Sequence, residues 1–225
     1  MARSAQGFGM TGSGTTLGRR LMDLVWVLFL LVLLWPVMLL IGLLILIQDG
    51  RPVFYVSERM KTPEQGFQLL KFRTMTNVDT DSGVSGGDKA HRITQIGAFL
   101  RKYRLDELPQ LLNILRGDIS FVGPRPPLRR YVERFPDLYT EVLKDRPGVT
   151  GLATLIYHRT EERLLSQCET AEETEAVYER RCVPRKARLD VLYAKQRTLC
   201  SDQRLTVATY FAGSRLFIET ALRAD

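Results

Sequence analysis

An adjacent pair of acids surrounded by basic residues is the strongest chemical signal in the sequence. Asp106 and Glu107 follow Arg101, Lys102 and Arg104 in the run RKYRLDELPQLLNILRGD. The pattern predicts that both acids lie at a helix N-terminus, where the helix dipole and free N–H groups favour ionised carboxylates. Capping alone would explain the two acids but does not need three cations beside them. Neighbouring helical residues point about 100° apart, so one acid could attack a substrate or bind metal while a base holds the other.

Further cations stand beside turn-forming residues in three other segments. These are Lys71 and Arg73 in KFRTM, Arg125 in GPRPP and Arg146 in DRPGVTG. An arginine between prolines has lost much of its backbone freedom, and its planar fork suits phosphate or carboxylate. Each segment alone is explained by a solvated turn. Together with the acid pair, they predict cations gathered around an acidic, Mg²⁺-binding centre, which suits a nucleotide-linked phosphate substrate.

Two further motifs imitate catalytic signatures in a polar, Gly-rich loop over residues 77–89. Asp79 and Asp81 form an Asp-x-Asp, a spacing that can hold a divalent ion on a nucleotide sugar. Residues 83–87 match G-x-S-x-G, but a nucleophile elbow needs a strand before it and a helix after it. We therefore keep only the aspartate pair as an alternative metal site.

Composition narrows the classes of protein without choosing one. The net charge of +7 suits nucleic acid, an anionic membrane surface or phosphorylated substrates equally. The three cysteines are widely spaced and form no CxxC, which argues against a disulfide framework and favours a reducing compartment. The two histidines offer little material for a His-rich zinc site or a Ser-His-Asp triad.

One long apolar run predicts membrane insertion. From Leu24 to Ile47 every residue except Pro36 is apolar or glycine, which exceeds the roughly 20 residues needed to cross a bilayer. Arg19 and Arg20 before the run favour a cytoplasmic N-terminus. The basic domain after the run, with its reduced cysteines, also belongs in the cytoplasm.

A straight span cannot leave both of its ends on one side of a membrane. We therefore predict a re-entrant helix-break-helix over 17–48, broken at Pro36 beside Trp35. Residues 1–16 are rich in Gly, Ser and Thr, which separately predicts a disordered N-terminus. Proline removes a backbone hydrogen bond and clashes with the preceding turn. The alternative is an ordinary span kinked by proline, which membrane helices tolerate.

We predict that residues 49–225 form one compact cytoplasmic domain. Its expected strands and helices give an α+β, mainly helical fold class. Two strands around a turn are expected over 51–72, and a short extended piece over 119–122. Apolar spacing predicts helices over 93–103, 106–115, 128–143, 161–181, 185–199 and 203–222. The helix over 185–199 is basic and amphipathic, so it either packs on the core or lies on anionic lipid at the membrane surface.

The segments KFRTM, LDELPQLLNILRGDISFVGPRP and RPGVTG together resemble the bacterial sugar transferases. These are monotopic polyprenyl-phosphate phosphoglycosyl transferases that begin surface-glycan assembly. The resemblance covers roughly residues 17–200 and is most specific in the central run. It implies a re-entrant membrane helix, a cytoplasmic domain with interfacial helices, an Asp-Glu dyad and Mg²⁺. It also implies transfer of a sugar-1-phosphate from a UDP-sugar to undecaprenyl phosphate at the cytoplasmic face of the bacterial inner membrane.

The resemblance assigns roles by position. Asp106 would be the nucleophile that takes the sugar phosphate and releases UMP, and Glu107 its partner in metal handling or proton transfer. Phosphate-contacting or site-organising cations would be Lys71, Arg73, Arg101, Arg125 and Arg146. Two departures stand out: Trp35 replaces the usual serine before the break, and LATLIYHRTEERLL follows RPGVTG, which leaves the sugar open.

Two other readings remain at this point. One is a membrane-anchored nucleotide-sugar glycosyltransferase that uses Asp79 and Asp81 and releases UDP. The other is a non-enzymatic, basic, membrane-anchored binding protein, although the sequence contains no recognisable nucleic-acid-binding motif, so we expect no nucleic-acid partner.

Overall fold

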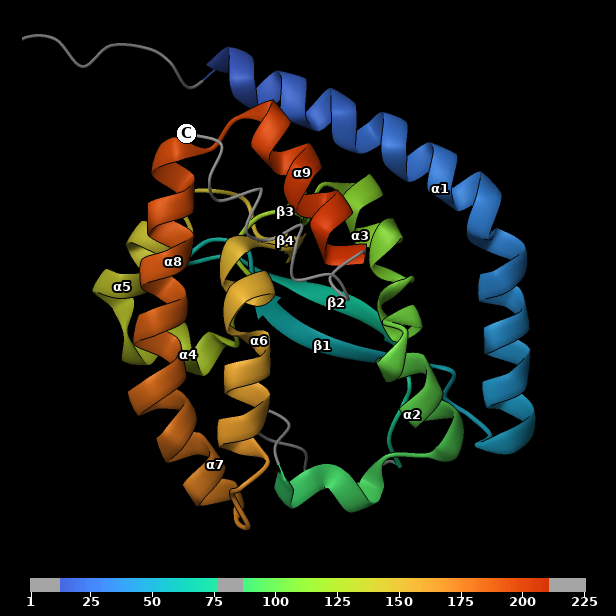
Figure 1. The fold of residues 1–225 in the computed structure, drawn as a ribbon. Coiled ribbons are helices and arrows are strands. Elements are labelled where there is room, and N and C mark those ends of the chain that lie inside the picture. Colours follow the sequence, from blue (N-terminus) through green and yellow to red (C-terminus); the bar gives the residue numbers. More distant parts are fainter. Residues whose placement is uncertain (1–12, 77–86, 211–225) are drawn as a thin grey trace, which may run out of the picture.

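A computed structural model describes residues 13–76 and 87–210 and shows a mainly helical protein with two small sheets (Figure 1). The predicted α+β, mainly helical class is confirmed. The helices are α1 (Ser13–Gln48), α2 (Gln95–Lys102), α3 (Gln110–Arg116), α4 (Arg129–Arg134), α5 (Pro136–Val142), α6 (Leu152–Leu165), α7 (Ala171–Val177), α8 (Val183–Gln196) and α9 (Leu199–Tyr210). Shorter turns are the 3₁₀ helices η1 (Gly87–Arg92) and η2 (Leu105–Glu107) and the π-helix η3 (Tyr178–Cys182). The strands are β1 (Phe54–Met60), β2 (Gly66–Phe72), β3 (Ser120–Val122) and β4 (Gly148–Thr150).

Helix α1 remains helical through Pro36. The predicted break at Pro36 is therefore not an interruption of the helix; α1 instead changes direction in its second half (Figure 1). Proline is the usual cause of such a bend, because its ring displaces the preceding turn while the flanking hydrogen bonds survive. The helix begins at Ser13, inside the segment 1–16 for which disorder is predicted, and residues 1–12 lie outside the described part.

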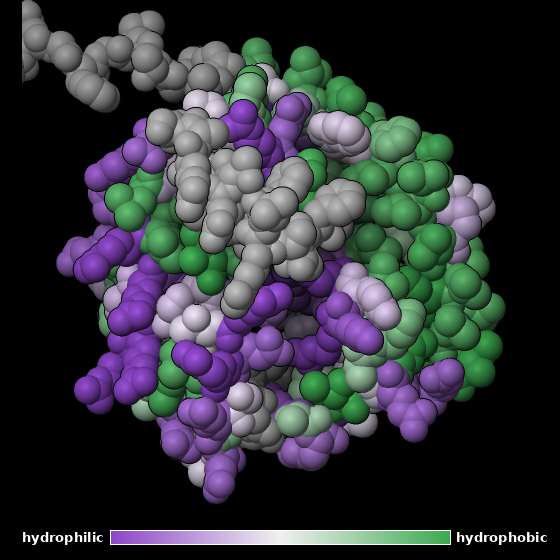
Figure 2. Space-filling model, in the orientation of Figure 1, coloured by the Kyte–Doolittle hydropathy of each residue, from purple (hydrophilic) through white to green (hydrophobic). Residues whose placement is uncertain are grey.

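Both halves of α1 pack on the domain. Val27 in the first half is completely buried against β2, α3 and β3, and Ile41 and Ile45 in the second half pack against α2 and the end of β2. The opposite face of the helix is apolar and exposed: Trp35, for example, exposes 59% of its surface. Figure 2 shows this face as a continuous hydrophobic area along one side of the molecule. Such a patch marks a surface that water does not normally cover.

Polar contacts fix both ends of α1 to the same domain. Near the start, Arg20 donates to the carbonyls of Ile114 (2.6 Å) and Leu115 (2.9 Å), which the end of α3 leaves unpaired. Asp23, which is buried, accepts a hydrogen bond from the Ser120 hydroxyl at 2.7 Å. At the other end, Arg73 donates hydrogen bonds to backbone carbonyls of the connection that directly follows α1.

The hairpin β1–β2 lies at the centre of the fold, as the sequence predicts for residues 51–72 (Figure 1). Its free β2 edge is paired by a side chain of α3. The Asn113 amide accepts from the Leu70 N–H (3.0 Å) and donates to the Gln68 carbonyl (2.8 Å), and it also donates to Asp118 (3.0 Å). Asn113 is completely buried, so these bonds set how α3 lies against β2.

A second, parallel pair joins β3 to β4. The extended piece at 119–122 was predicted, but β4 was not, because RPGVTG reads as a turn. Gly148 passes so close to the opposite chain that a Cβ there would lie 2.2 Å from the backbone nitrogen of Gly123. Glycine is therefore required where the two segments cross.

Helices α4 to α8 enclose a separate core around Tyr131, Tyr139 and Cys182. Four predicted helices differ from the structure. The helix predicted over 128–143 is divided into α4 and α5 before Pro136, and the one over 161–181 begins earlier as α6 and ends as α7 and η3. The helix over 106–115 is shortened to α3, and the one over 203–222 begins earlier, as α9, with residues 211–222 outside the described part. Helix α8 packs on this core through Val183 and Ala187, whereas Leu192 is exposed. The core-packed alternative for 185–199 is thus correct for one face of this helix.

Candidate active site

A cavity of about 600 Å³ opens between the hairpin, η2 and the helices α6 and α8. Figure 2 shows it as a hollow with hydrophilic side chains around its rim. Nine of its lining residues are basic: Arg59, Lys71, Arg73, Lys89, Arg92, Arg101, Arg104, Arg125 and Lys186. Its size is within the range of small-molecule sites, and its charge suits an anionic ligand.

The acid pair lies on η2, a single 3₁₀ turn before α3, and not in the first turn of α3 itself. The cause is Arg104, whose left-handed backbone (φ 56°, ψ 24°) follows the end of α2 and redirects the chain before η2. Residues other than glycine rarely adopt this conformation, and it is often found where surrounding structure enforces it at functional sites. Asp106 and Glu107 both line the cavity as a result.

Glu107 is bound by three cations. Its Oε1 contacts Lys71 Nζ at 2.8 Å and Arg125 at 3.3 Å, and its Oε2 contacts Arg104 at 3.0 Å. Burial alone would raise the pKa of Glu107, but the three cations outweigh it and hold the pKa well below its ordinary value. Glu107 is therefore a fixed anion that aligns the basic side chains around it.

Asp106 has different surroundings. No residue in the ranges 13–76 and 87–210 hydrogen bonds to its carboxylate or forms an ion pair with it. Burial raises the pKa of Asp106, and the charge of Glu107 adds to this, while Lys71 and Arg101 act against it. The two neighbouring acids thus have opposite pKa shifts, and only Asp106 has oxygens free to react or to bind a ligand.

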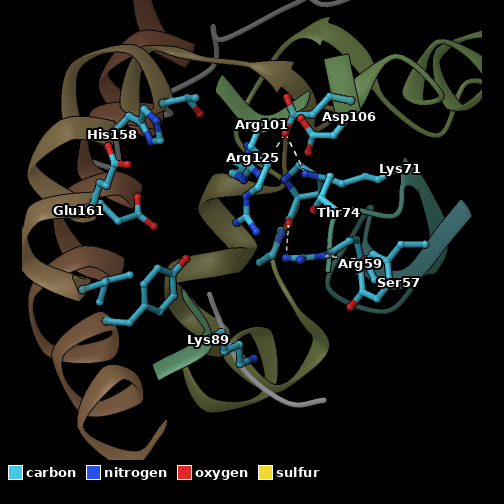
Figure 3. Close-up of a pocket in the computed structure, with 18 of the residues that line it drawn as sticks. Ser57, Arg59, Lys71, Thr74, Lys89, Arg101, Asp106, Arg125, His158 and Glu161 are labelled. Carbon is cyan, nitrogen blue, oxygen red and sulfur yellow. Dashed lines mark hydrogen bonds and ion pairs between the residues drawn. The ribbon is translucent and has the colours of Figure 1, made fainter. Parts of the chain in front are cut away.

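The structure brings Lys71, Arg101 and Arg125 to the same wall of the cavity as the acids (Figure 3). Burial lowers the pKa of Lys71 although Glu107 opposes the change. Glu107 raises the pKa of Arg125, whose place between Pro124 and Pro126 directs it into the cavity. Arg101, on the last turn of α2, keeps its guanidinium free of partners within the described residues.

Two of the predicted cations do not bind the acid pair. Arg73 is buried, and it donates to the carbonyls of Asp49 (2.6 Å), Gly50 (2.8 Å) and Arg51 (3.3 Å). Its guanidinium thus ties the end of α1 to the hairpin, although the residue also borders the cavity. Arg146 is exposed and is not part of the cavity lining; it lies close enough to Asp23 of α1 to interact with it electrostatically. Asp79 and Asp81 lie outside the described residues.

The donor set fits a magnesium ion that is shared with a ligand. Residues 13–76 and 87–210 contain no group of three acidic, histidine or cysteine side chains placed to hold a metal. Magnesium in phosphate sites commonly takes one or two carboxylates and completes its shell with phosphate oxygens and water. Asp106 can supply such a carboxylate, whereas Glu107 would first have to release one of its cations.

Sequence reasoning missed several lining residues. Arg59 follows Tyr55 and Ser57 along one face of β1, a period of two that could have revealed it. Its guanidinium reaches the carbonyl of Pro126 at 3.5 Å, which joins the hairpin to the segment of Arg125. Lys89 and Arg92 on η1 were also missed. Further missed residues lie on α6 and α8, where no single motif signalled them: Thr154, His158, Glu161, Glu162, Lys186 and Asp190.

Asp190 of α8 supports the first turn of α6. It accepts a hydrogen bond from the backbone N–H of Ala153 in the first turn of α6, and burial raises its pKa to about 7. Gly151 precedes this turn, and a side chain there would collide with the Gly123 carbonyl. The wall formed by α6 is therefore fixed at its N-terminus by α8.

Comparisons with known proteins show the family of this chain. The bacterial sugar transferase family matches residues 14–215. A UDP-N-acetylgalactosamine-undecaprenyl-phosphate N-acetylgalactosaminephosphotransferase of Aeromonas hydrophila is 33% identical over 145 residues, which are 62% of this chain and 34% of that protein. A UDP-glucose:undecaprenyl-phosphate glucose-1-phosphate transferase of Klebsiella pneumoniae is 34% identical over 199 residues, 87% of this chain and 40% of the relative.

A third relative is shorter. The exopolysaccharide production protein ExoY of Rhizobium meliloti is 41% identical over 138 residues, 54% of this chain and 61% of that protein. The chain therefore spans between about a third and three fifths of the length of these relatives. Because the family match extends over most of the sequence and includes α1, the cavity and the acid pair, the chain belongs to the bacterial sugar transferase family.

Proposed function

We propose that this protein transfers a sugar-1-phosphate from a UDP-sugar to undecaprenyl phosphate, as the first membrane step of surface polysaccharide assembly. The observation that carries the proposal is the pairing of a free carboxylate, Asp106, with a neighbour that is saturated by cations, Glu107. An acid intended only for charge balance would be paired, as Glu107 is. The names of the relatives supply the donor and acceptor classes.

In the proposed first step, an Asp106 oxygen attacks the phosphorus that bears the sugar. A bond forms between this oxygen and the phosphorus, and the bond to the bridging oxygen breaks, so UMP leaves with the electron pair. Lys71, Arg101 and Arg125 would bind the diphosphate and offset the charge that develops on UMP. Magnesium, when bound, would neutralise phosphate charge in the same place.

In the second step, a phosphate oxygen of undecaprenyl phosphate attacks the phosphoaspartate and releases Asp106. The lipid product then carries a diphosphate linked to the sugar. Two steps at one carboxylate allow a water-soluble donor and a membrane-bound acceptor to use the cavity in turn. Glu107 would keep Lys71 and Arg125 aligned during both steps.

The way α1 packs on the domain favours a re-entrant placement of this helix in the inner membrane, with the domain on the cytoplasmic face. A straight helix of this length would extend about 50 Å, and a span places its ends on opposite sides of a hydrocarbon core of about 30 Å. Yet Arg20 and Arg73 fix the two ends of α1 to one domain. A bend at Pro36, with the apolar face outward, lets the helix enter lipid shallowly while both ends stay on one side.

The reaction is tested with the purified full chain, a panel of UDP-sugars, Mg²⁺ and undecaprenyl phosphate. We expect Mg²⁺-dependent UMP release that is lost in Asp106→Asn. Undiminished turnover in Asp106→Asn would refute the nucleophile. Release of UDP in place of UMP would favour the glycosyltransferase reading with Asp79 and Asp81.

Topology has its own test. Single cysteines replace Leu17 and Arg51, at the two ends of α1, in a Cys200→Ser background, because Cys200 is the exposed one of the three native thiols. In spheroplasts, a membrane-impermeant thiol reagent should label neither position, and in inside-out vesicles it should label both. Labelling of one position in spheroplasts would indicate an ordinary span.

A further inference from the structure

The two sides of the active-site cavity differ in charge. One side holds Lys71, Arg101 and Arg125 around the acid pair, and the other is formed by α6 and α8. Figure 3 shows His158 and Glu161 on this second side, across the cavity from Asp106 and Lys71. Glu162 and Asp190 add further carboxyl groups to the second side.

The second side is a single face of helix α6. Thr154, His158, Glu161 and Leu165 follow one another at intervals of four, three and four positions, and Glu162, next to Glu161, lies four after His158 and three before Leu165, so one stripe of the helix faces the cavity. The stripe is polar except for Leu165, although helix faces that pack in a core are apolar. We call these five residues the α6 stripe.

In the α6 stripe, Glu162 and His158 have side chains available to bind a ligand, whereas Glu161 is already paired. Glu161 is bound by Lys186, with contacts of 2.9 and 3.1 Å, which fixes its position. Glu162 forms no ion pair or hydrogen bond with its side chain inside the ranges 13–76 and 87–210. Burial lowers the pKa of His158, and Arg104 and Arg125 lower it further, which favours the neutral imidazole, a form that can both donate and accept.

Carboxylates at this place are unsuited to phosphate, which they repel. They are suited to neutral hydroxyl groups, which donate hydrogen bonds to an ionised acceptor more strongly than to a neutral one. The only neutral, hydroxyl-rich parts of a UDP-sugar are the sugar and the ribose. With the diphosphate on the cationic side and the reacting phosphorus at Asp106, the group attached directly to that phosphorus is the sugar.

We propose that the α6 stripe, through Glu162 and His158, binds the hydroxyl groups of the donor sugar and selects which UDP-sugar is used. The inference rests on the proposed function and names its specificity-determining residues. A site built to hydrogen bond a hydroxyl discriminates strongly against a donor that lacks or misplaces it.

The test measures binding and turnover separately. In an Asp106→Asn background, which keeps the donor intact, calorimetry gives the dissociation constants of UDP, UDP-glucose, UDP-galactose, UDP-N-acetylglucosamine and UDP-N-acetylgalactosamine. The ratio of the UDP constant to each UDP-sugar constant is the contribution of that sugar. We expect Glu162→Gln and His158→Leu to reduce the contribution of the preferred sugar about tenfold or more, while UDP binding changes less than about twofold.

The matched control is Glu172→Gln in the first turn of α7, an exposed glutamate that does not line the cavity. It should leave every ratio unchanged, and circular dichroism should show that all variants are folded. Unchanged ratios in Glu162→Gln and His158→Leu, or an equal loss of UDP and UDP-sugar binding, would overturn the inference. Failure of the proposed function would appear elsewhere, as the absence of UMP release from the unmodified chain.

Discussion

Replacing Asn113 by alanine should be among the most destabilising single changes in the domain. Asn113 is completely buried, and its amide pairs with one N–H and one C=O of the β2 edge and with Asp118. Alanine supplies none of these bonds and is too small to fill the space, while α3 still prevents water from reaching the edge. The Leu70 N–H and the Gln68 carbonyl would therefore remain buried without partners.

The magnitude follows from those two groups. Leaving a buried donor or acceptor unsatisfied costs about 1–3 kcal/mol each. Allowing for partial relaxation and for the lost packing, we expect Asn113→Ala to lower the free energy of unfolding by about 3–5 kcal/mol. Asn113→Asp keeps the shape and the acceptor for Leu70, but it loses both donated bonds and sets a carboxylate against Asp118 at about the present 3.0 Å. It should therefore also destabilise the protein, and less so at low pH, where protonation restores a donor.

Urea unfolding of the full chain in detergent, followed by circular dichroism, measures both changes. The control is Leu115→Ala on the same helix, a partly exposed position where we expect a loss of about 1 kcal/mol or less. UMP release should fall with Asn113→Ala even under conditions where the variant is folded, because β2 carries Lys71 and α3 follows Glu107. An unfolding free energy within about 0.5 kcal/mol of the unmodified protein would refute the argument that this amide joins α3 to the hairpin.

Three other changes test the site and its supports. Glu107→Gln leaves three cations without their counter-ion, so it should lower the free energy of unfolding by about 3 kcal/mol. It should also lower the rate of UMP release at least about 100-fold, and normal turnover would contradict the role of Glu107 in aligning the cations. Gly97→Ala places a Cβ about 2.1 Å from the Thr74 carbonyl oxygen, so urea unfolding should show a free energy of unfolding lowered by more than about 3 kcal/mol. The control is Gly18→Ala, whose Cβ would have its nearest neighbour at 3.9 Å and which should be neutral or stabilising. The pKa of Asp190, about 7 in the folded state, lies above that of the unfolded chain, so its contribution to stability is present at low pH and is lost as pH rises from about 4 to 7. Relative to the unmodified protein, Asp190→Asn should therefore gain roughly 2–3 kcal/mol between pH 5 and pH 8, and a difference independent of pH would contradict this shift.

Local sequence patterns predicted much of the architecture. Alternating residues and the KTPEQG turn gave the hairpin at nearly its observed bounds, because neighbouring residues decide strand pairing in a hairpin. Regular apolar spacing predicted α2 and α8 within two or three residues. The boundaries failed where the reason is non-local: η2 exists because Arg104 is forced into a left-handed conformation between α2 and α3, and β4 exists because Gly148 meets Gly123.

The sequence by itself determined the acid pair, its basic surroundings and the apolar helix, since these depend on residue type and on neighbours in the chain. Only the tertiary structure decided that Glu107 takes the three cations and leaves Asp106 free, because those cations come from β2, the GPRPP segment and the residue before η2. It also decided that Arg73 ties down α1, that Arg146 lies outside the cavity, and that α6 supplies the opposite wall. Side chains far apart in sequence meet only when helices and strands pack, and charge and burial at their meeting point then set what each one does.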